Sequence, residues 1–138
     1  MTATSVLFVC VKNGGKSQMA AGLMRKAVAE TGGDVTIASA GTNAGDRLNE
    51  QSVRSLLDVG VDITDQTPRQ LTPQMVDAAD LVVVLGSEAH VDPAPGTTVE
   101  TWETDEPSLR GVEGAERMAL IREDIAARTT ELAHRLTT

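Results

Sequence analysis

The sequence predicts an α/β fold with three layers, in which helices lie on both faces of an open, parallel, four-stranded sheet. The first observation is that short apolar runs alternate with longer stretches whose apolar residues recur at helical spacing. The second is the run Leu81–Leu85, LVVVL, which is apolar throughout, as a parallel strand covered on both faces should be. With 138 residues the chain can bury one substantial core, so residues 1–138 are expected to form a single domain.

The four strands are expected where short runs carry mainly β-branched or bulky residues. These runs are residues 6–10, 35–40, 81–85 and 98–102. Open parallel sheets bind ligands beyond the carboxyl ends of their strands. Polar or reactive residues just after a strand are therefore the first candidates for a site.

The helices are expected over residues 17–31, 49–59 and, with a weaker pattern, 73–79. A last helix has the clearest pattern, because its apolar residues form one stripe with Arg and Glu elsewhere. The stripe consists of Met118, Ile121, Ile125, Leu132 and Leu136, with Thr129 as a polar member.

The composition excludes several classes of function. A net charge of −8 without a basic stripe argues against nucleic acid as a partner. One cysteine and two histidines allow neither an internal disulfide nor a recognisable zinc site, so no bound metal or cofactor is expected. No apolar run could cross a bilayer, and the N-terminus lacks the pattern of a signal peptide. The sequence thus predicts a cytoplasmic protein with no membrane partner.

The single cysteine, Cys10, ends the first strand and opens a loop that leads into the first helix. Gly14 and Gly15 would let the backbone curl with its N–H groups pointing inward, which makes an anion site at a helix N-terminus. The same groups would stabilise a thiolate. Lys12 and Lys16 flank the loop and add positive charge. The alternative is that Cys10 is a small buried hydrophobe, but that reading gives no reason for the two lysines.

Two further residues of the loop have expected roles. Ser17 is placed either to cap the helix or to give its hydroxyl hydrogen to the thiolate. Asn13 is expected to stabilise the turn, because asparagine tolerates left-handed backbone angles.

Cys10, Asn13, Lys16 and Ser17 resemble the phosphate loop of the low-molecular-weight protein tyrosine phosphatases and of the arsenate reductases that share their flavodoxin-like fold. Three more segments are similar to that family in the same order: residues 39–42 (SAGT), 68–84 and 102–107 (WETDEP). The resemblance implies that Cys10 is the nucleophile and that the loop binds an oxyanion. The loop residues are Val11, Lys12, Asn13, Gly14, Gly15, Lys16 and Ser17.

The resemblance also implies a general acid just before Pro107. Glu106 occupies that position, where the family normally has Asp, and Asp105 is the alternative. The remaining reading is that both are solvated acids of a loop. Because a carboxyl group can protonate a departing oxygen, either residue would suit the role.

Three departures from the family pattern favour arsenate over a phosphotyrosyl substrate. Lys16 replaces the loop arginine, whose planar fork would hold two oxyanion oxygens at once. Residues 43–47 and 108–110 lack the aromatics that would wall a tyrosyl ring. The single cysteine cannot form the internal relay that thioredoxin-coupled relatives use.

Within the family, the single cysteine and the lysine-containing loop resemble the arsenate–mycothiol transferase branch. This resemblance implies a low-molecular-weight thiol, expected to be mycothiol, as co-substrate and a glutaredoxin-like protein (mycoredoxin) as reductase partner. Cys10 would attack arsenic itself, or would position arsenate for attack by the thiol. The alternatives are a phosphatase with an unusual lysine and an oxyanion binder without catalytic activity.

Overall fold

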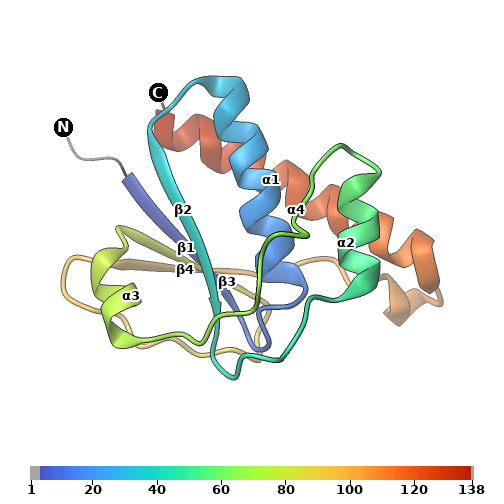
Figure 1. The fold of residues 1–138 in the computed structure, drawn as a ribbon, viewed down its shortest axis with the longest axis horizontal. Coiled ribbons are helices and arrows are strands. Elements are labelled where there is room, and N and C mark those ends of the chain that lie inside the picture. The colour runs from blue at the N-terminus through green and yellow to red at the C-terminus, as the bar shows by residue number, and fades with distance from the viewer. Residues whose placement is uncertain (1–3, 138) are drawn as a thin grey trace.

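The structure is a computed structural model that describes residues 4–137. Figure 1 shows strands and helices alternating along most of the chain. In chain order the elements are β1 (Thr4–Cys10), α1 (Lys16–Thr31), β2 (Val35–Gly41), α2 (Glu50–Leu57), α3 (Pro73–Ala78), β3 (Leu81–Leu85), β4 (Thr98–Trp102), the 3₁₀ helix η1 (Pro107–Arg110) and α4 (Gly114–Thr137). All of the predicted strands and helices are present, with ends that differ by a few residues at most.

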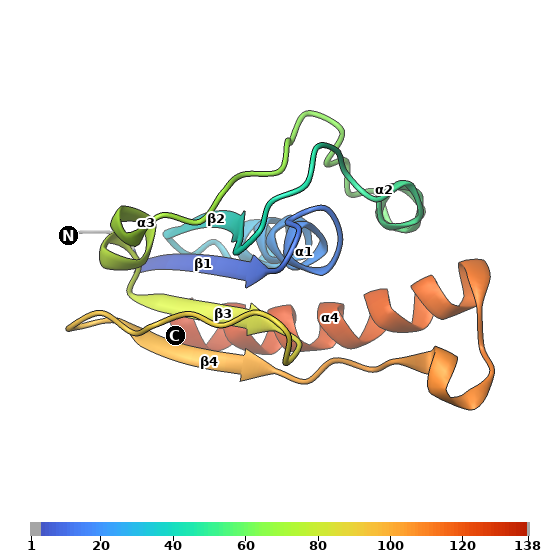
Figure 2. The ribbon, with the colours of Figure 1, turned by 90° about the horizontal axis from the view of Figure 1, so that it is seen from below.

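The four strands form one parallel sheet in the order β2-β1-β3-β4. This confirms the predicted open parallel sheet. β1 is therefore central, and Cys10 at its carboxyl end pairs with Gly41 at the end of β2. On the other side, the ends of β3 and β4 pair through Leu85 and Trp102. The loops that follow these strand ends meet at one edge of the sheet (Figure 2).

The two faces of the sheet are covered differently. α1 and α4 cover one face, on a core that includes Phe8 and Val83 from the strands, and α2 packs against these two helices. The short α3 and the loops beside it cover the other face, on a smaller core that includes Leu7, Val82 and Val76. Neighbouring residues of β1 and β3 thus belong to opposite cores, which explains why both strands are almost continuously apolar.

The stripe of α4 is buried as predicted. Met118, Ile121, Ile125 and Leu132 are buried, while Leu136 packs against the core from a partly exposed position. Thr129, the polar member of the stripe, is 1 % exposed. Its hydroxyl donates to the carbonyl of Ala126 at 3.1 Å, so the buried polar group is satisfied. Within residues 4–137, no helix combines the length and apolar character needed to cross a membrane.

Candidate active site

The loop after β1 forms one side of a cavity of about 970 Å³ at the carboxyl edge of the sheet. Loops after β2, β3 and β4 supply the other sides, as the topology predicts. The lining residues come from four segments: residues 10–16 without Asn13, 45–50, 85–88 and 103–106 without Asp105. Neither of the two aromatic residues of the chain lines it, because Phe8 and Trp102 pack against each other with ring centroids 5.8 Å apart.

The loop carbonyls are held from outside by the segment that follows β2. Thr42, Asn43 and Gly45 donate their N–H groups to the carbonyls of residues 10, 11 and 12 at 2.8–3.0 Å, and Asn49 donates to that of residue 14 at 2.7 Å. Among residues 4–137, the N–H groups of residues 12, 14 and 15 have no protein acceptor. A loop whose carbonyls point outward and whose amides are free can bind an anion.

Asn13, and neither glycine, takes the left-handed conformation of the loop. Its φ is 55° and its side chain is completely buried, which confirms the predicted role in the turn. Gly14 is required for a different reason: a Cβ there would lie 2.9 Å from the carbonyl oxygen of Arg47. Gly41 permits an even closer approach, since its Cβ would lie 2.5 Å from the carbonyl oxygen of Val11. The end of β2 therefore packs directly against the loop.

A chain of hydrogen bonds leads from the backbone of Arg69 to the sulfur of Cys10. The N–H of Arg69 donates to Asn13 Oδ1 at 2.8 Å, which fixes the orientation of the Asn13 amide. Asn13 Nδ2 then donates to Ser17 Oγ at 2.8 Å. Ser17 Oγ lies 2.9 Å from Cys10 Sγ. When Cys10 is a thiolate, which can only accept, Ser17 donates its hydroxyl hydrogen to the sulfur. The Asn13 N–H also donates to the sulfur, at 3.3 Å.

This arrangement decides between the two roles expected for Ser17. The capping role is wrong, because α1 begins at Lys16 with Gly15 as N-cap, and no side chain caps it. Ser17 already lies inside the first helical turn, where its side chain reaches back to Cys10. The alternative role, a hydroxyl directed at the sulfur, agrees with the geometry.

Gln18 also contributes to the site, and sequence reasoning missed it. It is 1 % exposed, and its Nε2 donates to Asn13 Oδ1 at 3.2 Å and to the carbonyl of Thr67 at 3.4 Å. Its Oε1 has no partner among residues 4–137. A polar side chain next to the apolar Met19 was the only available signal. Arg69 acts through its main chain, which no pattern of side chains reveals.

The two lysines both line the cavity. Lys16 is the first residue of α1 and is half-buried, whereas Lys12 is exposed. Within residues 4–137, neither ammonium group lies in an ion pair. Both charges are therefore available to an anion held by the loop. No group of three side chains with metal-binding chemistry occurs in the part of the chain that the structure describes.

Of the two candidate acids, only Glu106 lines the cavity. Its carboxylate accepts two hydrogen bonds from Arg117, at 2.7 and 2.9 Å, and one from the Ser108 hydroxyl at 2.7 Å. These bonds, with Arg117 the largest cause, lower the pKa of Glu106 to about 2. Asp105 forms a two-bond ion pair with Arg110 on the surface, and this pair lowers the pKa of Asp105 as well. Both carboxyl groups are thus ionised at neutral pH.

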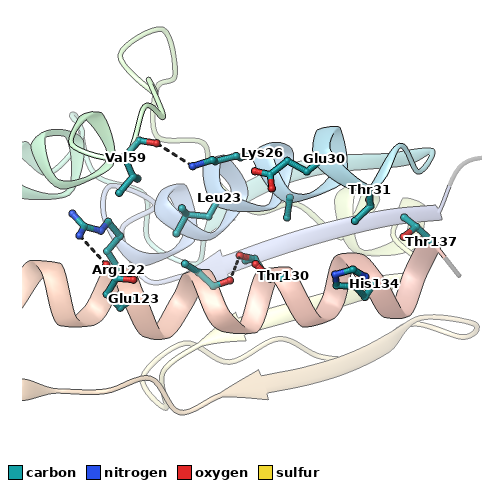
Figure 3. A pocket seen from close by; sticks show the side chains of 13 residues that line it. Leu23, Lys26, Glu30, Thr31, Val59, Arg122, Glu123, Thr130, His134 and Thr137 are labelled. Carbon is teal, nitrogen blue, oxygen red and sulfur yellow. Dashed lines mark hydrogen bonds and ion pairs between the residues drawn. The ribbon is translucent and has the colours of Figure 1, made fainter.

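A second cavity, of about 660 Å³, lies between α1 and α4 (Figure 3). It is lined by the part of α1 from Leu23 onward, whereas the Cys10 loop precedes the N-terminus of that helix. Its Lys26 ammonium donates to the carbonyl of Val59 at 3.1 Å, and its Arg122 guanidinium pairs with Glu123 at 2.9 Å. No residue of the candidate active site contributes to it.

The fold and the loop define an α/β protein that can hold an oxyanion against a thiol. A family model described as low molecular weight phosphotyrosine protein phosphatase matches residues 5–137, and the chain belongs to this family. The family resemblance inferred from the sequence is therefore confirmed.

One curated relative and two solved structures are similar to this chain. The arsenate reductase of Bacillus licheniformis is 31% identical over 140 residues, covering 96% of this chain and 97% of the relative. The solved thioredoxin-dependent arsenate reductase Cg_ArsC1' of Corynebacterium glutamicum has a TM-score of 0.78 and 29% identity, over 97% of this chain and 62% of that one. This chain thus spans less than two thirds of that relative. The Erwinia amylovora tyrosine phosphatase amsI, 19% identical, has the same fold, with a TM-score of 0.82 over 99% of this chain and 95% of that one.

Proposed function

We propose that the protein is an arsenate reductase that joins arsenate to a low-molecular-weight thiol, mycothiol in particular. The observation that carries the proposal is the sole cysteine, which ends β1, adjoins the anion loop and lies 2.9 Å from the Ser17 hydroxyl. Relatives named arsenate reductase that match 96% and 88% of this chain support arsenate as the anion. A chain with one cysteine has no internal thiol to continue the reduction, so an external thiol must do so. Such an enzyme would act in arsenical resistance, in the cytoplasm where small thiols are kept reduced.

The first reaction is a condensation. The thiol and arsenate form a sulfur–arsenic bond and release water, and arsenic stays pentavalent. In the second reaction a thiolate of a glutaredoxin-like protein, the mycoredoxin of the predicted pathway, attacks the sulfur of the adduct. The sulfur–arsenic bond breaks, its electron pair stays on arsenic, and arsenite leaves with a mixed disulfide remaining on the reductase.

Two routes lead to the adduct. In the first, the Cys10 thiolate attacks arsenic and is then displaced by the external thiol. In the second, Cys10 only positions arsenate, and the thiol attacks directly. In both, the free loop amides and the ammonium groups of Lys12 and Lys16 stabilise the oxyanion. Lysine acts as a point charge where arginine would grip two oxygens, which suits the more easily attacked arsenate better than phosphate.

A departing oxygen needs a proton, and we place this role at Glu106, because it lines the cavity and Asp105 does not. With a pKa of about 2, Glu106 holds no proton while Arg117 binds it, so the role requires Arg117 to release the carboxylate when substrate is present. Glu106→Gln should lower turnover by at least about tenfold, and Asp105→Asn should have a smaller effect. Unimpaired turnover in both variants would remove a protein acid from the scheme.

Mass spectrometry after mixing arsenate with candidate thiols tests the proposal. The expected product is a thiol–arsenic adduct that requires active protein and is absent with Cys10→Ser. Lys26→Met is a suitable control, because it removes a lysine outside the active-site cavity. A chain that bound arsenate tightly but formed no adduct with any thiol would be an oxyanion binder.

The family membership itself favours a second function, hydrolysis of phosphate esters. The test is hydrolysis of an aryl phosphate by the wild-type protein and by Cys10→Ser. The absence of an aromatic side chain from the described lining of the cavity argues for weak turnover of this substrate. Efficient hydrolysis that depends on Cys10 would identify a phosphatase.

A further inference from the structure

The active-site cavity is far larger than a single tetrahedral oxyanion. Its volume of about 970 Å³ lies in the range of sites that hold whole organic molecules, about 300–1,000 Å³. The loop of Cys10 accounts for one side of it. The space left over is therefore available to a second substrate, and the side chains around it restrict which one.

The side away from the loop is acidic. Glu88 follows β3 and Glu103 follows β4, and both line the cavity. Neither carboxylate takes part in an ion pair with another residue between 4 and 137. Glu106, which lies near Glu103 in the chain, is neutralised by Arg117. The uncompensated negative charge of this wall thus comes from two residues on two neighbouring strand ends.

The cavity therefore offers two electrostatic environments. Lys12, Lys16 and the loop amides attract an anion on one side, where the segment after β2 adds charges of both signs (Asp46, Arg47 and Glu50). On the side of β3 and β4, Glu88 and Glu103 repel anionic groups. The polar residues Ser87 and Thr104, which neighbour these two glutamates in the chain, also line the space. Hydroxyl groups of this kind suit a ligand that carries hydroxyls.

We propose that Glu88 and Glu103 select the thiol co-substrate by charge, admitting a neutral or cationic thiol rich in hydroxyls and excluding anionic thiols. This inference rests on the proposed function. The two carboxylates act as specificity-determining groups: they neither bind the oxyanion nor exchange a proton. Their effect should depend on ionic strength, since both residues are exposed.

The first experiment compares cysteamine with 3-mercaptopropionate, thiols of similar size that carry an ammonium and a carboxylate. For each, kcat/KM of arsenate-dependent adduct formation is measured with the wild-type protein and with Glu88→Gln/Glu103→Gln. The double variant should raise the ratio of carboxylate to ammonium thiol by about tenfold. For each thiol, the kcat/KM of the double variant is divided by that of the wild-type protein, so the intrinsic reactivity of the thiol cancels. Glu116→Gln/Glu131→Gln removes the same charge from exposed positions on α4 and should leave the ratio unchanged.

A second experiment needs no arsenate chemistry. Because Cys10 is the only cysteine, its rate of modification by 2-aminoethyl and 2-sulfonatoethyl methanethiosulfonate reports access by a cation and an anion. The Glu88→Gln/Glu103→Gln variant should shift the ratio of these two rates toward the anion by severalfold, and 0.5 M salt should reduce this shift. An equal ratio in the double variant and the wild type would overturn the charge selection.

The two experiments separate the two claims. If the wild-type protein forms an adduct with neither thiol while the modification rates shift as expected, the proposed reaction is wrong, but the control of access by Glu88 and Glu103 is supported. If adducts form with a ratio that does not respond to the double variant, the reaction stands and the charge selection is wrong.

Discussion

At the scale of single residues, Asn13 links three other residues of the candidate active site through its side chain. One buried amide accepts from the backbone of Arg69 and from Gln18, and donates to Ser17. Since the backbone N–H can only donate, it determines which end of the amide faces Ser17. The orientation of the Asn13 amide, which donates to the Ser17 hydroxyl beside Cys10, is thus decided by a residue 59 positions from Cys10 in the chain.

Ser17→Ala tests the last link of this chain. The variant removes a donor from the sulfur, so Cys10 should react with iodoacetamide about tenfold more slowly at pH 7, as the loss of one hydrogen bond of about 1.4 kcal/mol predicts. Ser17→Thr, which keeps the hydroxyl, should recover part of the rate. The measurement is a pseudo-first-order alkylation rate followed by mass spectrometry. A rate equal to that of the wild type would show that the hydroxyl does not act on the sulfur.

Glu106 gives a prediction for acid stability at the same scale. Its pKa falls from 4.5 to about 2 in the folded protein, so the unfolded chain binds the proton more tightly. The stabilisation is therefore fully present above about pH 4.5 and is lost as the pH falls through about 2. The urea midpoint of the wild-type protein should fall over this window, and that of Glu106→Gln should fall less.

Two controls accompany this measurement. Glu131→Gln changes an exposed carboxyl group on α4 and should follow the wild-type curve. Arg117→Met removes the partner that lowers the pKa of Glu106 and should flatten the curve as Glu106→Gln does. Parallel curves for all of these proteins would contradict the assignment of the pKa to this ion pair.

At the scale of elements, the end of β2 shapes the loop that follows β1. Gly41 donates to the carbonyl of Arg69 at 2.8 Å and accepts from Leu71 at 2.9 Å, so it also anchors the segment that carries Arg69. The same glycine lies against the Val11 carbonyl and the Asn13 N–H. A single strand end thus positions both the loop and the group that orients Asn13.

Gly41→Ala should be strongly unfavourable for this reason. Its Cβ would lie 2.5 Å from the Val11 oxygen and 2.9 Å from the Asn13 nitrogen, so backbone must shift, at a cost of about 1–3 kcal/mol in unfolding free energy. Gly45→Ala is the matched variant, because its nearest contact would be 3.9 Å from Lys12. Urea unfolding of the two variants provides the measurement. Equal unfolding free energies of the two variants would show that the loop can shift to accommodate the Cβ at position 41 without loss of stability.

At the scale of the whole molecule, the predictable features are those that depend on local pattern. The apolar run of β3 and the stripe of α4 identified their elements, because burial of one face or of both faces leaves a periodicity in the chain. The position of Cys10 at the carboxyl end of β1 then identified the site edge, since parallel strands place their carboxyl ends together. The loop and its lysines could be found in this way.

Features that depend on contacts between distant segments could not be predicted. Gln18 and Thr67 are 49 positions apart, and Arg69 contributes only an N–H group that nearly every residue possesses. The cap was predicted two residues too late, at Ser17, because the sequence does not show that the loop ends at Gly15. The ion pairs of Asp105 and Glu106 required the positions of Arg110 and Arg117 in space.

The solitary sulfur has a consequence for the lifetime of the protein under oxidative stress. If peroxide converts Cys10 to a sulfenic acid, no neighbouring thiol of the same chain can condense with it and shield it from further, irreversible oxidation. Rescue must arrive from solution as a mixed disulfide. If the proposed reaction holds, cells would need their pool of small thiols for two purposes, turnover and repair of Cys10.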